Sequence, residues 1–147
     1  MRRPLAVTAS ATLLIALLTA CAGGPTEADR SAWSGWFTEI TSAASGDTVG
    51  AQLTGVDSGG GATRIDFATP TPYRSVELRC IGSDRAAFTL TYTGADDSVT
   101  LTQDIVCHGG EPLTPIALPT SVGPLTAFAA AATSAEAEGY WVATLQP

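Results

Sequence analysis

Lysine is absent from this chain of 147 residues, and basic side chains of any kind are scarce. If residues 1–20 are removed, as argued below, five arginines stand against 14 acidic residues, which gives a formal net charge of −9. A domain this acidic repels nucleic-acid phosphates and has no basic patch with which to displace their counterions. We therefore expect no nucleic-acid partner.

Most catalytic and metal-binding patterns are absent too. His108 is the single histidine, and it follows Cys107 directly. The chain contains no G-x-S-x-G, no C-x-x-C and no G-x-G-x-x-G or G-K-[ST] phosphate loop. The acidic turns at residues 57–61 and 96–97 lack the D-x-D-x-D-G pattern of calcium loops. We expect no catalytic residue, no metal and no cofactor, and we interpret residues 108–111 as an exposed loop.

The N-terminal segment carries the pattern of an export signal. Two arginines precede an apolar run over residues 5–18, which is shorter than the roughly 20 residues that span a bilayer. The run ends in Leu-Thr-Ala-Cys at residues 18–21, a string that resembles the bacterial lipobox. The alternatives are an uncleaved membrane helix and an ordinary secretory signal, and the arginine pair leaves twin-arginine export open beside the general route.

The lipobox resemblance implies that residues 1–20 are a signal peptide removed by cleavage and that Cys21 receives a diacylglyceryl group with palmitate-type chains. Two acyl chains give stable anchoring, so membrane lipid becomes a partner through Cys21. We expect the protein on the outer face of the cytoplasmic membrane. Residues 21–30 are small and polar and predict a flexible tether, followed by a single domain over residues 31–147.

The three cysteines fit an exported lipoprotein. Lipidation occupies Cys21 and leaves Cys80 and Cys107, which are expected to form a disulfide outside the reducing cytosol. The alternative is a redox-active or metal-binding pair, but neither the spacing nor the histidine count favours it. A structural disulfide between Cys80 and Cys107 is therefore predicted.

One segment has the period of an amphipathic helix. Its apolar residues recur at i, i+3, i+4, i+7 and i+11, with Ser31 as the expected N-cap and Gly46 as the stop signal. We expect this stripe to pack on the domain. The alternative is a helix on the membrane surface, which the absence of lysine and the presence of Glu39 disfavour. The stripe consists of Trp33, Trp36, Phe37, Ile40 and Ala44.

From residue 48 onward the period changes to two. Short runs rich in threonine and aliphatic residues alternate in polarity, and residues 94–97 form a hairpin signal between two of them. This pattern predicts a mainly β domain, an antiparallel β-sandwich with one short N-terminal helix. Breaks are expected at residues 57–61 and 69–72. Residues 125–138 are ambiguous, because their alanines favour a helix whereas their place before a terminal strand favours a hairpin arm.

These motifs together resemble the small, uncharacterised, exported lipoproteins of actinobacteria. The resemblance covers the lipobox cysteine, Val-Glu-Leu-Arg-Cys at residues 76–80, Ile-Val-Cys-His-Gly at residues 105–109 and Gly-Tyr-Trp at residues 139–141. It implies a β-sandwich pinned by a disulfide, and it favours strand over residues 125–132. It supplies no catalytic residue.

The remaining functional signal is aromatic. Tyr140 and Trp141 are consecutive on an expected strand, so one of them points away from the core and becomes a candidate for ligand binding. The leading hypothesis is a non-enzymatic, membrane-anchored module that binds a cell-wall glycan or another envelope protein. The alternative is an accessory or structural subunit that docks on a membrane protein complex. Aromatic side chains on a concave face would favour the glycan.

Overall fold

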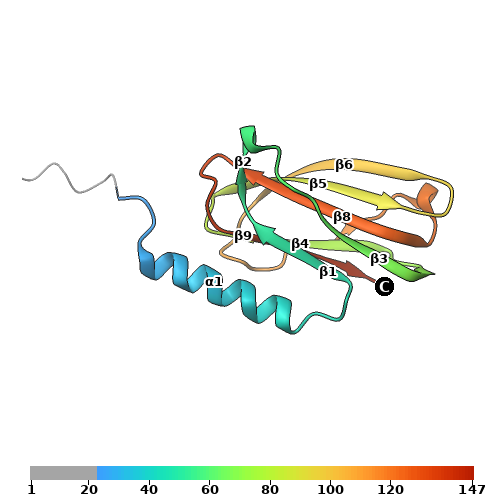
Figure 1. The fold of residues 1–147 in the computed structure, drawn as a ribbon, viewed down its shortest axis with the longest axis horizontal. Helices are drawn as coiled ribbons and strands as arrows, with labels where there is room; N and C mark the ends of the chain where they lie inside the picture. Colours follow the sequence, from blue (N-terminus) through green and yellow to red (C-terminus); the bar gives the residue numbers. More distant parts are fainter. Residues whose placement is uncertain (1–22) are drawn as a thin grey trace, which may run out of the picture.

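The computed structural model describes residues 23–147, in which two β-sheets face each other and one helix lies outside them (Figure 1). The predicted signal peptide and Cys21 lie outside the described residues. The elements are α1 (Glu27–Ser42), β1 (Thr48–Gln52), β2 (Thr54–Gly55), η1 (Val56–Ser58), β3 (Thr63–Thr71), β4 (Ser75–Ile81), β5 (Arg85–Thr93), β6 (Ser98–Val106), β7 (Ile116–Ala117), η2 (Thr120–Val122), β8 (Leu125–Ser134) and β9 (Tyr140–Gln146).

The two sheets form a β-sandwich. The first, sheet A, has the order β1-β9-β4-β7, and the second, sheet B, has the order β2-β8-β5-β6 with β3 also paired to β8. The pairs are antiparallel except for the short β2–β8 pair, which is parallel. The chain passes between the sheets six times, first at Leu53 directly after β1 and then after β3, β4, β6, β7 and β8. The predicted mainly β fold is confirmed.

The core lies between the sheets and follows from the alternation of side chains along each strand. In β4 and β5 every second residue is buried, as expected for strands with one face on a core. Aromatic rings fill the centre, with Phe88 of β5 set edge-on to Trp141 of β9 and Tyr92 stacked on Phe128. Such pairs add to the area they bury because the ring quadrupoles attract in these geometries.

The alanine-rich segment forms the central strand of sheet B. β8 pairs with β5 along one side and with β3 and β2 along the other, and its inward alanines Ala130 and Ala132 are almost completely buried. The expected strand over this segment is therefore confirmed, but the expected hairpin with the terminal strand is wrong, because β9 lies in sheet A and does not pair with β8. The helix preference of alanine is small, and pairing on both sides outweighs it.

Helix α1 begins earlier than the sequence stripe predicts. Thr26 is the N-cap and forms a capping box with Asp29, whose carboxylate accepts hydrogen bonds from the Thr26 backbone N–H and hydroxyl. The expected N-cap at Ser31 is therefore wrong, and residues 27–30 belong to the helix rather than to the tether. Within residues 23–147, no helix is long and apolar enough to cross a membrane.

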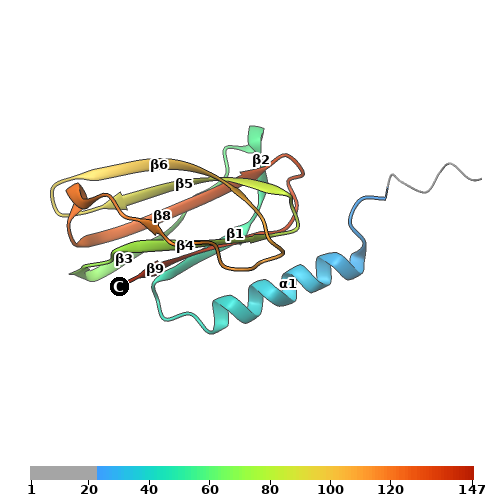
Figure 2. The same cartoon turned by 180° about the vertical axis from the view of Figure 1, so that it is seen from behind.

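The helix covers the outer face of sheet A, on the side away from β6 (Figure 2). Phe37 stacks on Tyr140 of β9, with ring centroids 4.9 Å apart, and its ring edge approaches Gly50 of β1. Beneath the helix lies Val142, which is fully buried although it is not part of the core between the sheets. The aromatic stripe therefore packs on the domain through residue 40, whereas Ala44 is exposed beyond the end of the helix.

The segment after β6 crosses to sheet A and follows the free edge of β4. The predicted disulfide joins Cys107 to Cys80 of β4. Beyond it, the Gly110 N–H donates to the Cys80 carbonyl and the Leu113 N–H donates to the Leu78 carbonyl. The disulfide and these backbone bonds cover an edge that would otherwise be open.

One expected break is part of a strand. β3 continues to Thr71, through the Thr-Pro sequence that predicts a break at residues 69–72. Its register with β8 shifts between Asp66 and Thr71, which accommodates Pro70 because an irregular stretch does not require the missing N–H.

Candidate functional site

The sandwich carries a hollow of about 200 Å³ beside the N-terminal half of α1. We call it the Tyr140 hollow. It lies where the helix, the end of β1 and the β8–β9 loop meet, so its walls come from three separate parts of the chain. Its main lining residues are Arg30, Trp33, Gln52, Glu138, Gly139 and Tyr140.

The two aromatic candidates on β9 point in opposite directions. Trp141 is 1% exposed and packs against Phe88 inside the sandwich, so its side chain cannot form part of a surface site. Tyr140 points to the outer face, where Phe37 covers one side of its ring and the Gln52 side chain donates to its hydroxyl over 3.3 Å. Of the two candidates for ligand binding, only Tyr140 faces outward. The prediction is wrong for Trp141, whose side chain belongs to the core.

The β8–β9 loop, which forms one wall of the hollow, is held in a fixed conformation. The Ser83 hydroxyl lies 2.8 Å from the Glu138 carbonyl oxygen and 3.0 Å from the Ser134 hydroxyl, which accepts from the Ala137 N–H. The Gly139 carbonyl accepts from the Leu53 N–H at the end of β1. Ala137 has a φ of 53°, a backbone conformation that non-glycine residues rarely adopt. Backbone strain that the surrounding hydrogen bonds maintain is typical of active sites and ligand-binding sites.

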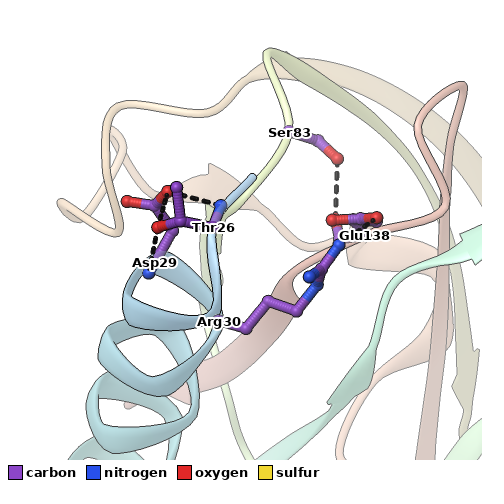
Figure 3. Close-up of polar contacts among 5 residues, drawn as sticks. All are labelled: Thr26, Asp29, Arg30, Ser83 and Glu138. Atoms are coloured by element: carbon purple, nitrogen blue, oxygen red, sulfur yellow. Dashed lines mark hydrogen bonds and ion pairs between the residues drawn. The ribbon is translucent and has the colours of Figure 1, made fainter. Parts of the chain in front are cut away.

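Glu138 faces the helix and pairs with Arg30 (Figure 3). The Arg30 Nη2 atom lies 3.1 Å from Glu138 Oε1, and the two side chains are 49% and 33% exposed. The second carboxylate oxygen, Oε2, is shielded from solvent and has no hydrogen-bond partner within the part of the chain that the structure describes. A buried carboxylate oxygen without a partner is costly, and because Oε2 has almost no accessible surface, a ligand in the hollow does not reach it.

The start of the helix is set by the neighbouring capping box. Hydrogen bonds from Thr26 lower the pKa of the Asp29 carboxyl from its ordinary value. Asp29 is therefore ionised at neutral pH, where its charge complements the helix N-terminus. The cap fixes the first turn and so places Arg30 over the hollow.

Trp33 separates the Tyr140 hollow from a second, more open one of about 480 Å³. The second hollow reaches across Gly82 to Asp84 and Glu136, and it borders Cys107. The Trp33 ring packs so close to Gly82 that an added Cβ would lie 3.0 Å from it. The Trp33 indole thus lines both hollows. Glu138 lies in the first hollow, and Asp84 and Glu136 lie in the second.

The other polar candidates stay apart from this site. His108 is exposed in the loop after β6, and the acidic turn at Asp96–Asp97 is the exposed tip of the β5–β6 hairpin. Asp57 lies in η1. Within residues 23–147, no three His, Cys, Asp or Glu side chains are grouped so as to hold a metal ion.

The site offers aromatic surface beside fixed hydrogen-bonding groups of both kinds. Gln52 both donates and accepts, Arg30 donates, and Glu138 accepts. A ring ligand with hydroxyl groups suits such a set, because its apolar face can lie on the Trp33 indole while its hydroxyls meet the polar rim. Sequence reasoning did not single out Arg30, Gln52 or Glu138. The T-x-x-D capping signal at residues 26–29 would have placed Arg30 on the helix.

Comparisons with known proteins add little to this picture. No protein-family model matches the chain, and no curated protein is similar to it. Among solved structures, a chain titled "Crystal structure of PirA" is similar at 12% sequence identity with a TM-score of 0.41. That alignment covers 70% of this chain and 96% of the PirA chain.

Proposed function

We propose that this protein is an exported lipoprotein, anchored through Cys21, whose Tyr140 hollow binds a glycan of the cell envelope without catalysing a reaction. The observation that supports glycan binding is the concave aromatic surface formed by Trp33 and Tyr140. The Arg30–Glu138 ion pair and Gln52 form its polar rim. The Glu138 carboxylate, held by Arg30, gives a ligand hydroxyl an acceptor at the rim of the hollow.

The length of the tether supports a ligand close to the membrane. Five residues, 22–26, lie between the proposed lipid attachment at Cys21 and the first residue of α1, so six Cα–Cα steps separate Cys21 from Glu27. Fully extended, they reach roughly 20 Å. Because Arg30 is one turn into the helix, the hollow stays near the outer membrane surface, where the inner layers of the wall lie.

The anchor is tested by the intact mass of the protein purified from membranes of the producing bacterium. We expect a chain that begins at Cys21 and is heavier than its sequence by a diacylglyceryl group. The Cys21→Ser variant is expected to keep residues 1–20 and to lack the added mass. A wild-type chain without lipid would refute the anchor.

Glycan binding is tested by co-sedimentation of the full-length protein, in mild detergent, with insoluble wall sacculi of the same bacterium. The Glu138→Gln substitution keeps the shape of the side chain and removes its charge, and we expect it to weaken binding about tenfold. Glu111→Gln is the matched control, because Glu111 is exposed in the loop after β6, outside the hollow.

A second pair of variants removes a neutral group. Gln52→Ala is expected to weaken binding to the sacculi, whereas Gln103→Ala, on β6, is expected to leave it unchanged. Absence of wild-type binding, or equal losses in the matched variants, would refute the glycan proposal. Capture of an envelope protein in place of polysaccharide would favour the accessory-subunit alternative.

A further inference from the structure

Strand β6 is a long sheet edge whose hydrogen-bonding pattern can be deduced from its two ends. At the hairpin, the Gly94 N–H donates to the Asp97 carbonyl, and at the other end the Cys107 N–H donates to the Asp84 carbonyl. Hydrogen-bonded and non-hydrogen-bonded pairs alternate along an antiparallel ladder, and the register between the two ends is unbroken. The even-numbered residues of β6 therefore stand in non-hydrogen-bonded pairs with β5.

Those even-numbered residues direct their backbone N–H and C=O groups away from β5, toward the open edge. All of them are exposed: Ser98, Thr100, Thr102, Asp104 and Val106. A side-chain contact agrees with this assignment, because side chains approach more closely across non-hydrogen-bonded pairs. The hydroxyl oxygens of Thr91 and Thr100, which form such a pair, lie 3.0 Å apart. The Asp104 carbonyl receives only a long contact, 3.5 Å, from its neighbour Gln103.

This edge has few of the features with which sheet proteins usually block strand addition. β6 has nine residues, no proline, no lysine and no bulge in its pairing with β5. The other described edges are protected, because β2 and β7 have two residues each, β3 contains Pro70 and a register shift, and residues 107–118 follow β4. β1 has five residues and leads directly into the crossing to sheet B.

We propose that β6 pairs with β6 of a second copy of this chain, antiparallel and about a two-fold axis at Thr102. Thr102 is the midpoint of the strand and one of the outward residues. In this register it lies opposite its own symmetry mate, Thr100 lies opposite Asp104 of the other copy, and Ser98 lies opposite Val106. Every outward backbone group of one copy then meets an outward group of the other.

The side chains permit this register. The one charge on the strand, Asp104, faces a threonine, and the two copies of Asp104 are offset by four residues, about 13 Å, which exceeds the screening length at physiological salt. Leu101, which is 39% exposed, lies beside the two-fold axis, so the interface between the two β6 strands also shields apolar surface. A basic strand of another protein would meet only one acidic side chain on β6. A second copy of β6, by contrast, is complementary to β6 along its full length.

The two-fold axis of such a pair runs perpendicular to the sheet, so each layer of one copy continues the same layer of the other. Both helices α1 then lie on one face of the dimer, because α1 covers the outer face of sheet A in each copy (Figure 1). Both chains can therefore reach one membrane. The proposal itself does not depend on the anchor.

The test is a crosslink in the full-length protein in its native membrane, with a short bismaleimide as the probe. Thr102→Cys places two thiols opposite each other at the axis, and we expect a covalent dimer. Thr89→Cys is the matched control, because Thr89 is exposed, lies opposite Thr102 in β5 and faces the same side. Its mate in the other copy is three strand spacings away, about 14 Å, and no dimer is expected.

Sedimentation of the purified full-length protein in detergent provides a second measurement at 0.15 M salt. Wild type and Thr89→Lys are expected to have the mass of two chains, whereas Thr102→Lys, which sets two ammonium groups opposite each other, is expected to have the mass of one. A monomeric wild type, equal crosslinking at positions 89 and 102, or a dimeric Thr102→Lys would overturn the proposal.

Discussion

Single residues at the β8–β9 corner decide the stability of the site. Gly139 has a φ of 97°, and a Cβ at this position would overlap the backbone carbonyl of Ile81. We expect Gly139→Ala to lower the free energy of unfolding by about 2–4 kcal/mol, since backbone strain and overlap add.

Gly35, an exposed helical position with nothing within 4 Å, is the opposite case. Gly35→Ala is expected to raise stability by up to about 1 kcal/mol. Urea unfolding measures both, and an equal effect of the two would contradict the account.

Tyr92 makes a separate prediction at the same scale. Its hydroxyl is buried in the core without a hydrogen-bond partner among residues 23–147, and burial raises its pKa to about 12. Because the pKa in the folded state exceeds the ordinary value near 10, the folded state holds the proton more tightly. The contribution of Tyr92 to stability is therefore fully present below pH 10 and is lost as the pH rises toward 12.

The Tyr92→Phe variant removes the unpartnered hydroxyl. We expect the free energy of unfolding at pH 8 to stay equal or to rise by up to about 1 kcal/mol. The loss of stability between pH 10 and pH 12 should be smaller than in wild type. Unfolding midpoints in urea at pH 8, 10 and 11 test this, and an identical alkaline loss in both proteins would contradict it.

Residue-scale features could be predicted only in part. Alternation along a strand requires Tyr140 and Trp141 to face opposite sides, but it does not say which side is the core. The answer depends on the register with β1 and β4, and that register joins residues far apart in the chain. Glu138 was missed for the same reason, since its partner Arg30 lies 108 residues away.

At the scale of elements, helix α1 depends on its cap and on its contacts with sheet A. All of its residues are at least partly exposed, so the first turn is held chiefly by Thr26 and Asp29. We expect Thr26→Ala to cost about 1 kcal/mol of helix stability and to speed deuterium exchange over residues 27–31. Thr38→Ala, in mid-helix, is the control and should not speed it. The cap should also weaken as the pH falls below the ordinary range of Asp29, because its pKa is lowered in the folded state.

Elements with clear periodicity were predictable, and elements defined by pairing were not. The alternation in β4, β5 and β6 and the hairpin at residues 94–97 follow from the sequence. The two-residue strands β2 and β7 carry no periodic signal, because each forms only where a neighbour offers free backbone groups. The strand at β8 was predictable only with the resemblance, since alanine alone favours a helix.

The sandwich as a whole depends on the Cys80–Cys107 disulfide, which closes a loop with a sequence separation of 27. On the chain-entropy model, such a loop contributes about 3–4 kcal/mol. We expect the Cys80→Ala/Cys107→Ala protein to lose about this free energy of unfolding, measured in urea against the oxidised wild type. Reduced wild type is the control and should match the double variant. A loss below about 1 kcal/mol would show that backbone bonds alone hold residues 107–118 on β4.

The central claim is that the Tyr140 hollow binds envelope glycan, and deuterium exchange of the full-length protein tests it most directly. The measurement compares the protein alone with the protein mixed with solubilised wall polysaccharide. We predict protection over residues 27–33, 52–55 and 137–141, the three segments that form the hollow. Protection confined to the proline-lined far end at residues 117–124, or no protection anywhere, would contradict the account.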